Sequence, residues 1–409
     1  MGLGGLFFGY LTIPHFVYFY FALSSVAVGL LIYAIALLII YSTRSRKFKI
    51  TALQFSILAL ATASICIYKT DDISRQIFSL IAIAVIFLST NMFFGDFTSR
   101  ADSDVKGIIK TLFYALLLIG LAGKLSLFNP GNYAVKETVF PFSEPSHYAL
   151  SLGPIACAYM LQLKTRGRLS VAVVVLLLGL WFPNSTLLAE SLLLFIVILR
   201  FWVQACVATL AILLALSIGV QGLEELPHYD YFAGRLGLLD ERENLTFLVY
   251  KQGWQQAAIA FSENYGLGIG FQRFGQESAG DAANRIDALY GIESNRMDGS
   301  NLGSKLVGEF GYVGIILSCS MVIYSSYCLI RLRRILTRCH IDHRYTVSIF
   351  YAFSYMYLIE VVFRGLSYFD PWFFIFCFGV SQMTRRAQLF KPHLSGDKGI
   401  SRSEIIVIT

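Results

Sequence analysis

The stretch IFSLIAIAVIFLSTNMFF, residues 77–94, decides the fold class of this chain. It contains no charged residue, and its length matches the apolar core of a bilayer, which about twenty helical residues cross at 1.5 Å per residue. Similar apolar runs recur near 17–41, 50–68, 108–127, 146–163, 169–182, 186–199, 203–220, 306–330, 345–363 and 371–384. We therefore predict an all-α, polytopic integral membrane protein with about eleven or twelve transmembrane helices.

The composition agrees with a chain that lies mostly in lipid. Of its 409 residues 56% are apolar and only 14% are charged, and the mean hydropathy is +0.63. A soluble protein of this length is about a quarter charged. The seven cysteines are scattered without CxxC or Cys/His spacing, so we expect neither a metal site nor a cofactor. We expect residues 1–409 to form a single membrane domain.

The distribution of Lys and Arg predicts the orientation. Most of them lie in one alternate set of loops, which includes 44–49, 164–168, 331–344 and the tail 385–409. By the positive-inside rule these loops are cytoplasmic, and the opposite set faces outward. The formal net charge of +7 is then explained by topology, and no nucleic-acid partner is expected.

A long polar segment, residues 221–305, belongs to the outward-facing set. Loops of this length are usually functional or disordered. Within it, 244–261 places Leu245, Leu248 and Trp254 at helical spacing. We predict an amphipathic helix there, lying at the membrane interface.

Polar groups gather on this outer side. In SEPSH, residues 143–147, Glu144 and His147 stand at the start of an apolar run. One interpretation is helix capping, in which Glu144 complements the positive end of the helix dipole. The other is a functional site, because capping does not require a histidine. The long loop adds Arg235, Arg242 and Arg273, which are either solvated loop residues or anion-binding groups.

Two later segments extend this set. Asn301, Lys305 and Glu309 follow one another at four-residue steps, which places them on one face of a helix. Glu309 is either a functional carboxylate inside a span or a buried counter-ion of Lys305. RGLSYFDPW, 364–372, supplies Arg364 and Tyr368. These residues either belong to the functional site or anchor the protein at the membrane interface, as a snorkelling arginine in a belt of aromatic residues.

The chemistry of these groups suits a phosphorylated lipid. An arginine fork binds phosphate oxygens in a bidentate way, and one such pair contributes roughly 4 kcal/mol at 4 Å and an effective dielectric near 20. A carboxylate and a histidine are suited to removing a proton from a hydroxyl.

Four segments together resemble the Wzy-type O-antigen and surface-polysaccharide repeat-unit polymerases, which are related to O-antigen ligases. They are FSEPSHYA, GRLGLLDERENL…ENYGLGIGFQRFG, GSNLGSKLVGEFGYVG and RGLSYFDPW, in this order between about 140 and 372. The resemblance implies a GT-C-like fold in the bacterial inner membrane, a periplasmic active face and a cytoplasmic C-terminus. It implies an inverting, metal-independent glycosyl transfer between two undecaprenyl-diphosphate-linked glycans, assisted by a Wzz-type chain-length regulator.

The resemblance also implies roles for the polar residues. Glu144, His147 and Arg242 would be catalytic. The substrate would be bound by a second set: Arg235, Arg273, Asn301, Glu309, Arg364 and Tyr368. Ligases usually carry a histidine in the loop before the helix at 302, and this chain has none between His228 and His340, which favours a polymerase over a ligase. The remaining alternatives are a flippase or transporter, and a protein with a purely structural role.

Overall fold

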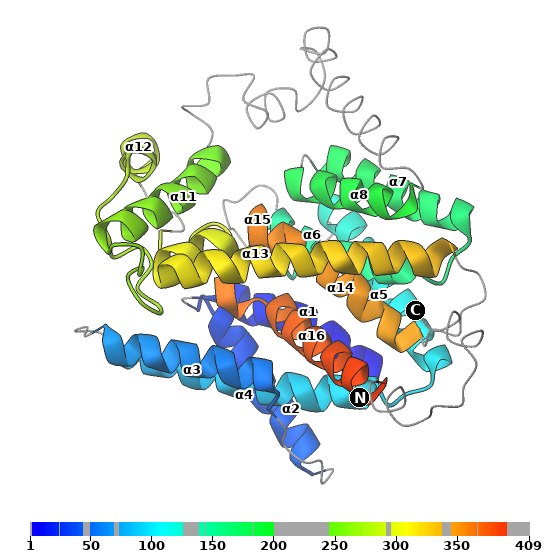
Figure 1. Ribbon diagram of the computed structural model, residues 1–409. Coiled ribbons are helices and arrows are strands. Elements are labelled where there is room, and N and C mark those ends of the chain that lie inside the picture. The colour runs from blue at the N-terminus through cyan, green and yellow to red at the C-terminus, as the bar shows by residue number, and fades with distance from the viewer. Residues whose placement is uncertain are drawn as a thin grey trace, which may run out of the picture.

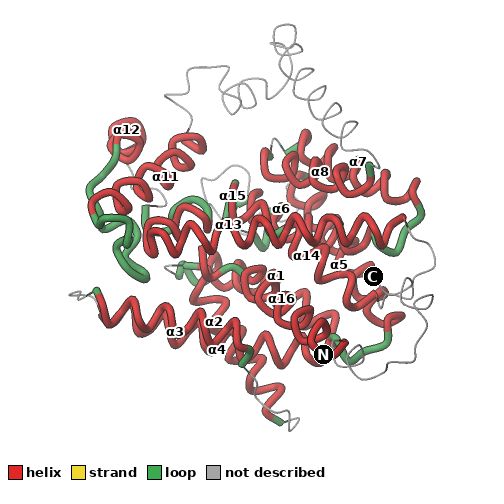
Figure 2. Tube along the Cα trace, viewed as in Figure 1, coloured by secondary structure: helices red, strands yellow, loops and turns green. Residues whose placement is uncertain are grey.

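The computed structural model is built from helices, and the residues that it describes form no strand (Figures 1 and 2). The described residues are 2–23, 25–43, 50–68, 73–125, 139–142, 144–182, 184–199, 245–291, 296–337, 345–365 and 367–390. The expected span at 203–220 and the end of the tail lie outside them. The prediction of an all-α protein is confirmed for the described part of the chain.

Apart from the first, each expected span within the described residues coincides with helical structure. The helices are α1 (Leu3–Tyr20), α2 (Val26–Ser42), α3 (Ala52–Ile67), α4 (Ile73–Phe97), α5 (Asp102–Lys124), α6 (Pro145–Met160), α7 (Thr165–Trp181), α8 (Ser185–Ile198), α11 (Leu245–Glu263), α12 (Asp281–Tyr290), α13 (Leu302–Thr337), α14 (Tyr345–Met356), α15 (Leu358–Val362), the short 3₁₀ helix η2 (Ser367–Phe369) and α16 (Pro371–Phe390).

Four of these helices are long and apolar enough to cross a membrane: α4, α5, α13 and the segment Tyr345–Val362. The bundle also exposes large apolar side chains along its flanks, among them Phe55, Leu118 and Ile323. Apolar surface on this scale is rare on soluble monomers. The protein is therefore membrane-embedded, and the crossing of the remaining helices stays a prediction.

The first expected span needs correction. Instead of one helix at 17–41, the structure has α1 and α2, joined by a turn in which Ala22 has a φ of +48°. The two helices pack against each other, and Tyr33 of α2 donates a hydrogen bond to the carbonyl of Leu6 (2.7 Å). Three glycines and Pro14 within α1 weaken its signal in the sequence, because these residues disfavour isolated helices. In the folded protein, packing outweighs that preference.

The amphipathic helix expected at 244–261 is present as α11. Its apolar residues Leu248 and Val249 are buried against Ile286 of α12, and α11 also packs on α13. Much of the apolar face therefore contacts protein, and the interfacial position of the helix stays a prediction. In Figure 1, α11 and α12 lie together at one end of the molecule, beyond the beginning of α13.

Helix α13 is broken at Gly311, whose φ of 55° and ψ of −125° are not helical. A loop wedges into the break: the amides of Ile269 and Gly270 donate to the carbonyls of Gly308 and Glu309 (3.0 and 2.9 Å). In return, the amide of Tyr312 donates to the carbonyl of Gly266 (2.9 Å). The loop thus satisfies backbone groups that the broken helix leaves open. The break separates a short segment that carries Lys305 and Glu309 from the long span that follows.

At the other end of the bundle, Asp102 joins two helices. Its carboxylate accepts from the backbone amides of Tyr345 (2.7 Å) and Thr346 (3.1 Å), and also from the Thr346 hydroxyl. The first amides of a helix have no partner within the helix, so Asp102, in the first turn of α5, caps α14 from outside.

We expect Asp102→Ala to lower the free energy of unfolding by about 1–2 kcal/mol, because it removes the cap of α14. The measurement is the melting temperature of the purified protein in detergent. Asp104→Ala is the matched control, since Asp104 is an exposed acidic residue in the same turn. Equal melting temperatures for the two variants would contradict the capping role.

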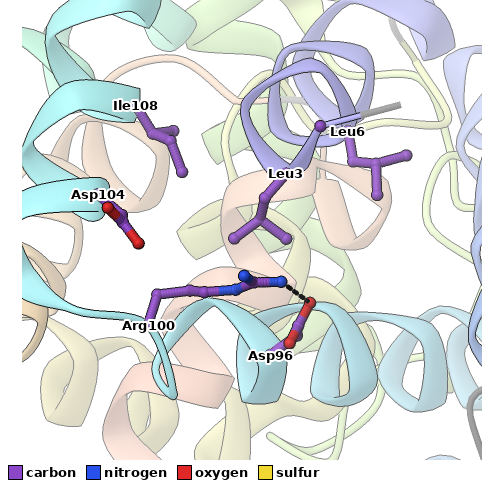
Figure 3. A pocket seen from close by; sticks show the side chains of 7 residues that line it. Leu3, Leu6, Asp96, Arg100, Asp104 and Ile108 are labelled. Atoms are coloured by element: carbon purple, nitrogen blue, oxygen red, sulfur yellow. Dashed lines mark ion pairs between the residues drawn. The ribbon is translucent and has the colours of Figure 1, made fainter.

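Cavities mark the two ends of the bundle. At one end, Leu3, Asp96, Arg100 and Asp104 line a cavity of about 230 Å³, in which Arg100 and Asp96 form an ion pair at 3.5 Å (Figure 3). At the other end, a larger cavity includes Tyr18. Because Leu3 and Tyr18 lie at opposite ends of α1, the cavities are separated by roughly 22 Å along that helix.

Candidate functional site

The larger cavity has a volume of about 780 Å³ and lies where several helix ends meet. The ends that form it are those of α1, α2, α4, α6, α13 and η2. The charge distribution of the loops predicted that Glu144, Arg364 and the segment 221–305 lie on one side of the membrane, and Glu144, Arg364 and Asp298 all line this cavity. The structure therefore gathers the segments that the sequence grouped, whereas the side of the membrane that they face stays a prediction.

Two sets of side chains line the cavity, one apolar and one charged, which we call its apolar wall and its charged wall. Phe19, Leu23, Val26 and Leu31 of the α1–α2 region, with Phe78 and Ala82 of α4, make the apolar wall. The charged wall comes from distant parts of the chain and contains Arg75, Glu144, His147, Asp298, Lys305 and Arg364. An amphipathic ligand with an anionic head and a hydrocarbon tail matches this division.

Glu144 and Arg364 form a close ion pair at the cavity. The Arg364 guanidinium donates to Glu144 Oε2 at 2.7 Å, and the hydroxyl of Ser146 donates to the same oxygen at 2.9 Å. Burial by itself raises the pKa of Glu144, but His147, Arg364 and the Ser146 hydroxyl outweigh it and hold this pKa at about 2. Glu144 is therefore an anion at neutral pH and a weak proton acceptor.

The turn that carries Arg364 is fixed by backbone hydrogen bonds. The amide of Arg364 donates to the carbonyl of Ile359 (2.9 Å), and the amide of Gly365 donates to that of Ser300 (3.1 Å). Asp370 then caps α16 by accepting from the amide of Trp372 (2.7 Å). The guanidinium is thereby held at the cavity, with 17% of its side chain exposed.

His147 lies in the first turn of α6, one turn from Glu144. Pro145 suits this turn, because the first helical residues need no backbone N–H partner. The ring of His147 lies 5.2 Å from that of His15 in α1. His147 lines the same cavity as Glu144 and Asp298.

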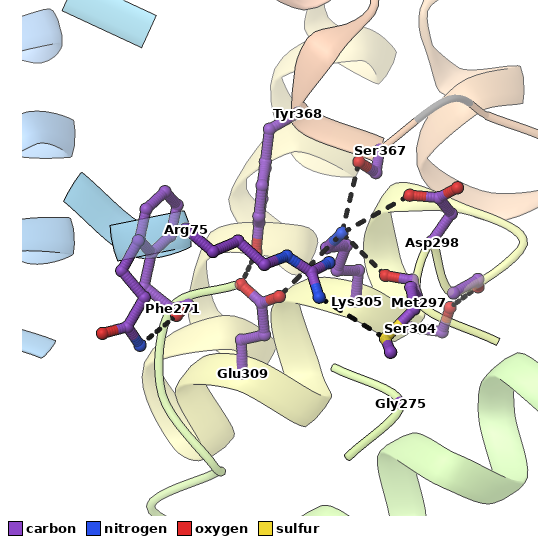
Figure 4. A network of polar contacts seen from close by, with 12 residues as sticks. Arg75, Phe271, Gly275, Met297, Asp298, Ser304, Lys305, Glu309, Ser367 and Tyr368 are labelled. Atoms are coloured by element: carbon purple, nitrogen blue, oxygen red, sulfur yellow. Dashed lines mark hydrogen bonds and ion pairs between the residues drawn. The ribbon is translucent and has the colours of Figure 1, made fainter. Parts of the chain in front are cut away.

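Lys305 is the most buried cation of the cavity, with 2% of its side chain exposed (Figure 4). Its ammonium donates to the carbonyl of Met297 at 3.0 Å and to the Ser367 hydroxyl at 3.4 Å. Two carboxylates lie further away, Asp298 at 3.8 Å and Glu309 at 4.0 Å. A buried charge needs such partners to offset the loss of hydration.

Glu309 and Tyr368 contact Lys305 from outside the cavity lining. The Tyr368 hydroxyl donates to Glu309 Oε2 at 2.9 Å, and the ammonium of Lys305 lies 5.4 Å from the centre of the Tyr368 ring. Glu309 is fully buried and does not line the cavity. Of the two interpretations left open by the sequence, this geometry favours the buried counter-ion.

The other expected site residues lie apart from the cavity. Asn301 is buried at the start of α13, where its side chain accepts from the amide of Ser304 (2.9 Å) and so caps the helix. Arg273 donates to Gln276 at 3.1 Å and does not line the cavity. Arg235 and Arg242 lie outside the described residues, so their roles stay predictions.

Sequence reasoning missed three residues of the charged wall. Arg75 was not named as a site residue. Lys305 was considered only as a partner of Glu309. Asp298 was not considered, since nothing in the sequence brings the loop 296–300 next to Arg364.

No family model, curated protein or solved structure matches this chain.

Proposed function

We propose that this protein is a membrane glycosyltransferase of the O-antigen polymerase type, which joins lipid-diphosphate-linked oligosaccharide repeat units into a surface polysaccharide. The observation that supports this function best is the mixed lining of the cavity, which combines apolar side chains with three cations, Arg75, Lys305 and Arg364. A polyprenyl diphosphate has the matching division into an apolar tail and an anionic head.

The donor lies with its tail along Val26, Leu31 and Phe78 and its diphosphate at Arg364 and Lys305. An arginine offers five N–H donors, and Glu144 takes one of those on Arg364. The guanidinium therefore keeps donors for phosphate oxygens. Charge that develops on the leaving diphosphate is stabilised by cations that the protein has already oriented.

The sugar hydroxyl of the acceptor attacks the anomeric carbon from the side opposite the diphosphate, which inverts the configuration. The bond from carbon to the diphosphate oxygen breaks and leaves its electron pair on that oxygen. Glu144 aligns Arg364, and His147, which lines the same cavity, orients the acceptor. Two cations at the leaving group take the role that a metal ion has in other transferases.

The proposal places the protein in a bacterial inner membrane, with the cavity at the periplasmic face and the C-terminus in the cytoplasm. The repeat units are presented on undecaprenyl diphosphate, and a Wzz-type regulator sets the chain length. A ligase, which transfers glycan to the lipid A core, and a flippase are the rival functions, and both are distinguished by the product that accumulates without the protein.

Deletion of the gene in its native host tests the function. A polymerase leaves surface lipid capped with single repeat units, and a plasmid copy restores the ladder of long chains. Loss of all capping indicates a ligase. Retention of repeat units on the cytoplasmic face indicates a flippase, and either of these results contradicts the proposal.

Glu144→Gln tests the role of the ion pair within that function. The amide keeps the shape of the side chain and removes its charge, so Arg364 loses its fixed orientation. We expect polymerisation to slow by roughly 10- to 100-fold, seen as a shorter ladder. Glu263→Gln on the exposed face of α11 is the control. A full-length ladder from Glu144→Gln, at normal protein level, would show that the pair is dispensable.

A further inference from the structure

The loop 296–300 brings a further carboxylate, that of Asp298, to the charged wall that also contains Glu144 and Arg364. Gly299 and Ser300 have φ values of +77° and +61°, which turn the chain sharply after Asp298. The Asp298 side chain is 60% exposed and lines the cavity. Figure 4 shows it beside Lys305, on the side away from Glu309.

This loop is tied to the turn that carries Arg364. The amide of Gly365 donates to the carbonyl of Ser300 (3.1 Å), and Lys305 bridges Met297 and Ser367. Two hydrogen-bonded loops therefore hold Asp298 and Arg364 at fixed positions. A residue that removes a proton needs such a fixed relation to the group that binds the leaving diphosphate.

The other carboxylates near the cavity are less suited to accept a proton. Glu144 Oε2 already receives two hydrogen bonds, from Arg364 and Ser146. Glu309 is fully buried, bonded to Tyr368 and outside the cavity. The carboxylate of Asp298 has its nearest cation at 3.8 Å, beyond hydrogen-bond distance, and within the described parts of the chain no donor satisfies it.

We propose that Asp298 is the catalytic base, which accepts the proton of the acceptor hydroxyl. This inference rests on the function proposed above. Lys305, beside it, faces the departing anion during the reaction. The pair thus places the proton acceptor and a phosphate-binding cation 3.8 Å apart.

The step balances in charge and atoms. The hydroxyl oxygen forms the new bond to the anomeric carbon while its proton moves to an oxygen of Asp298. The electron pair of the broken bond stays on the diphosphate, which leaves with one more negative charge. Asp298 then releases the proton to water in the open cavity, so no further reactant is required.

The experiment compares transfer with binding in the full-length protein. Membranes that contain Asp298→Asn are supplied with the lipid-linked repeat units of the native host, and chain growth is timed. In parallel, the purified variant is titrated with farnesyl diphosphate as the probe of the anion site. We expect chain growth to slow by roughly 100- to 10,000-fold, with unchanged KM and unchanged probe affinity. Asp298→Glu, which restores a carboxylate, should recover part of the rate.

Matched variants separate the possible outcomes. Asp287→Asn, on the exposed face of α12, should behave like the wild type. A wild-type rate for Asp298→Asn would overturn the assignment and leave the proposed function intact. Equal loss of rate and probe affinity would also overturn it, since Asp298 would then shape the anion site. A wild-type protein that neither extends chains nor binds the probe would refute the proposed function itself.

Discussion

Arg364→Ala is expected to slow chain elongation by roughly 100- to 1,000-fold. The substitution removes the guanidinium that would receive the leaving diphosphate and also leaves Glu144 as an anion without its partner at 2.7 Å. Both changes raise the energy of the same charged transition state. The ladder of surface polysaccharide, compared at equal protein level, gives the measurement.

Graded variants show whether geometry or charge matters at this position. Arg364→Lys keeps the charge but loses the planar fork, so an intermediate rate is expected. Arg285→Ala removes an exposed arginine of α12 and serves as the control for general loss of positive charge. If Arg364→Ala and Arg285→Ala gave the same ladder as the wild type, Arg364 would have no part in binding the diphosphate.

Gly311→Ala is expected to have the largest effect on stability, a loss on the order of 3–5 kcal/mol in the free energy of unfolding. The φ and ψ angles at Gly311 disfavour any residue with a Cβ atom, and that atom would overlap the carbonyl oxygen of Gly266. Relief of the overlap would expel the wedged loop and break its hydrogen bonds to Gly308 and Glu309.

The melting temperature in detergent measures this loss. Gly95→Ala is a matched control, because Gly95 lies within α4 and a Cβ atom there meets nothing within 4 Å. That variant should be neutral or slightly more stable, since alanine favours a helix over glycine by about 1 kcal/mol. Similar melting temperatures for both alanine variants would mean that the break in α13 tolerates a side chain.

Hydropathy was sufficient to locate most of the bundle. Long uniform runs such as those of α4 and α5 need no tertiary information, because length and apolarity alone predict them. Helix α1 was missed since its glycines and Pro14 weaken the local signal, while its stability comes from packing. Phe7, for example, is fully buried between Phe94 and Phe353.

The site was predictable where residues share a helix end or a membrane side. Glu144, His147 and Arg364 were expected together, because the charge of the loops placed all three on the same face. Their pairing and the place of Asp298 were not predictable, since they depend on how loops far apart in the sequence fold against each other. Asn301 showed the limit of the residue pattern: its spacing suggested binding, whereas its contacts cap a helix.

The contact between Glu144 and Arg364 joins residues 220 positions apart. After Glu144 has been incorporated, the ribosome must still add more than half of the chain before Arg364 is present. The cavity that these residues line is therefore completed only near the end of synthesis. During much of translation, the cellular quality-control machinery would therefore encounter a chain in which Glu144 has no Arg364 to pair with.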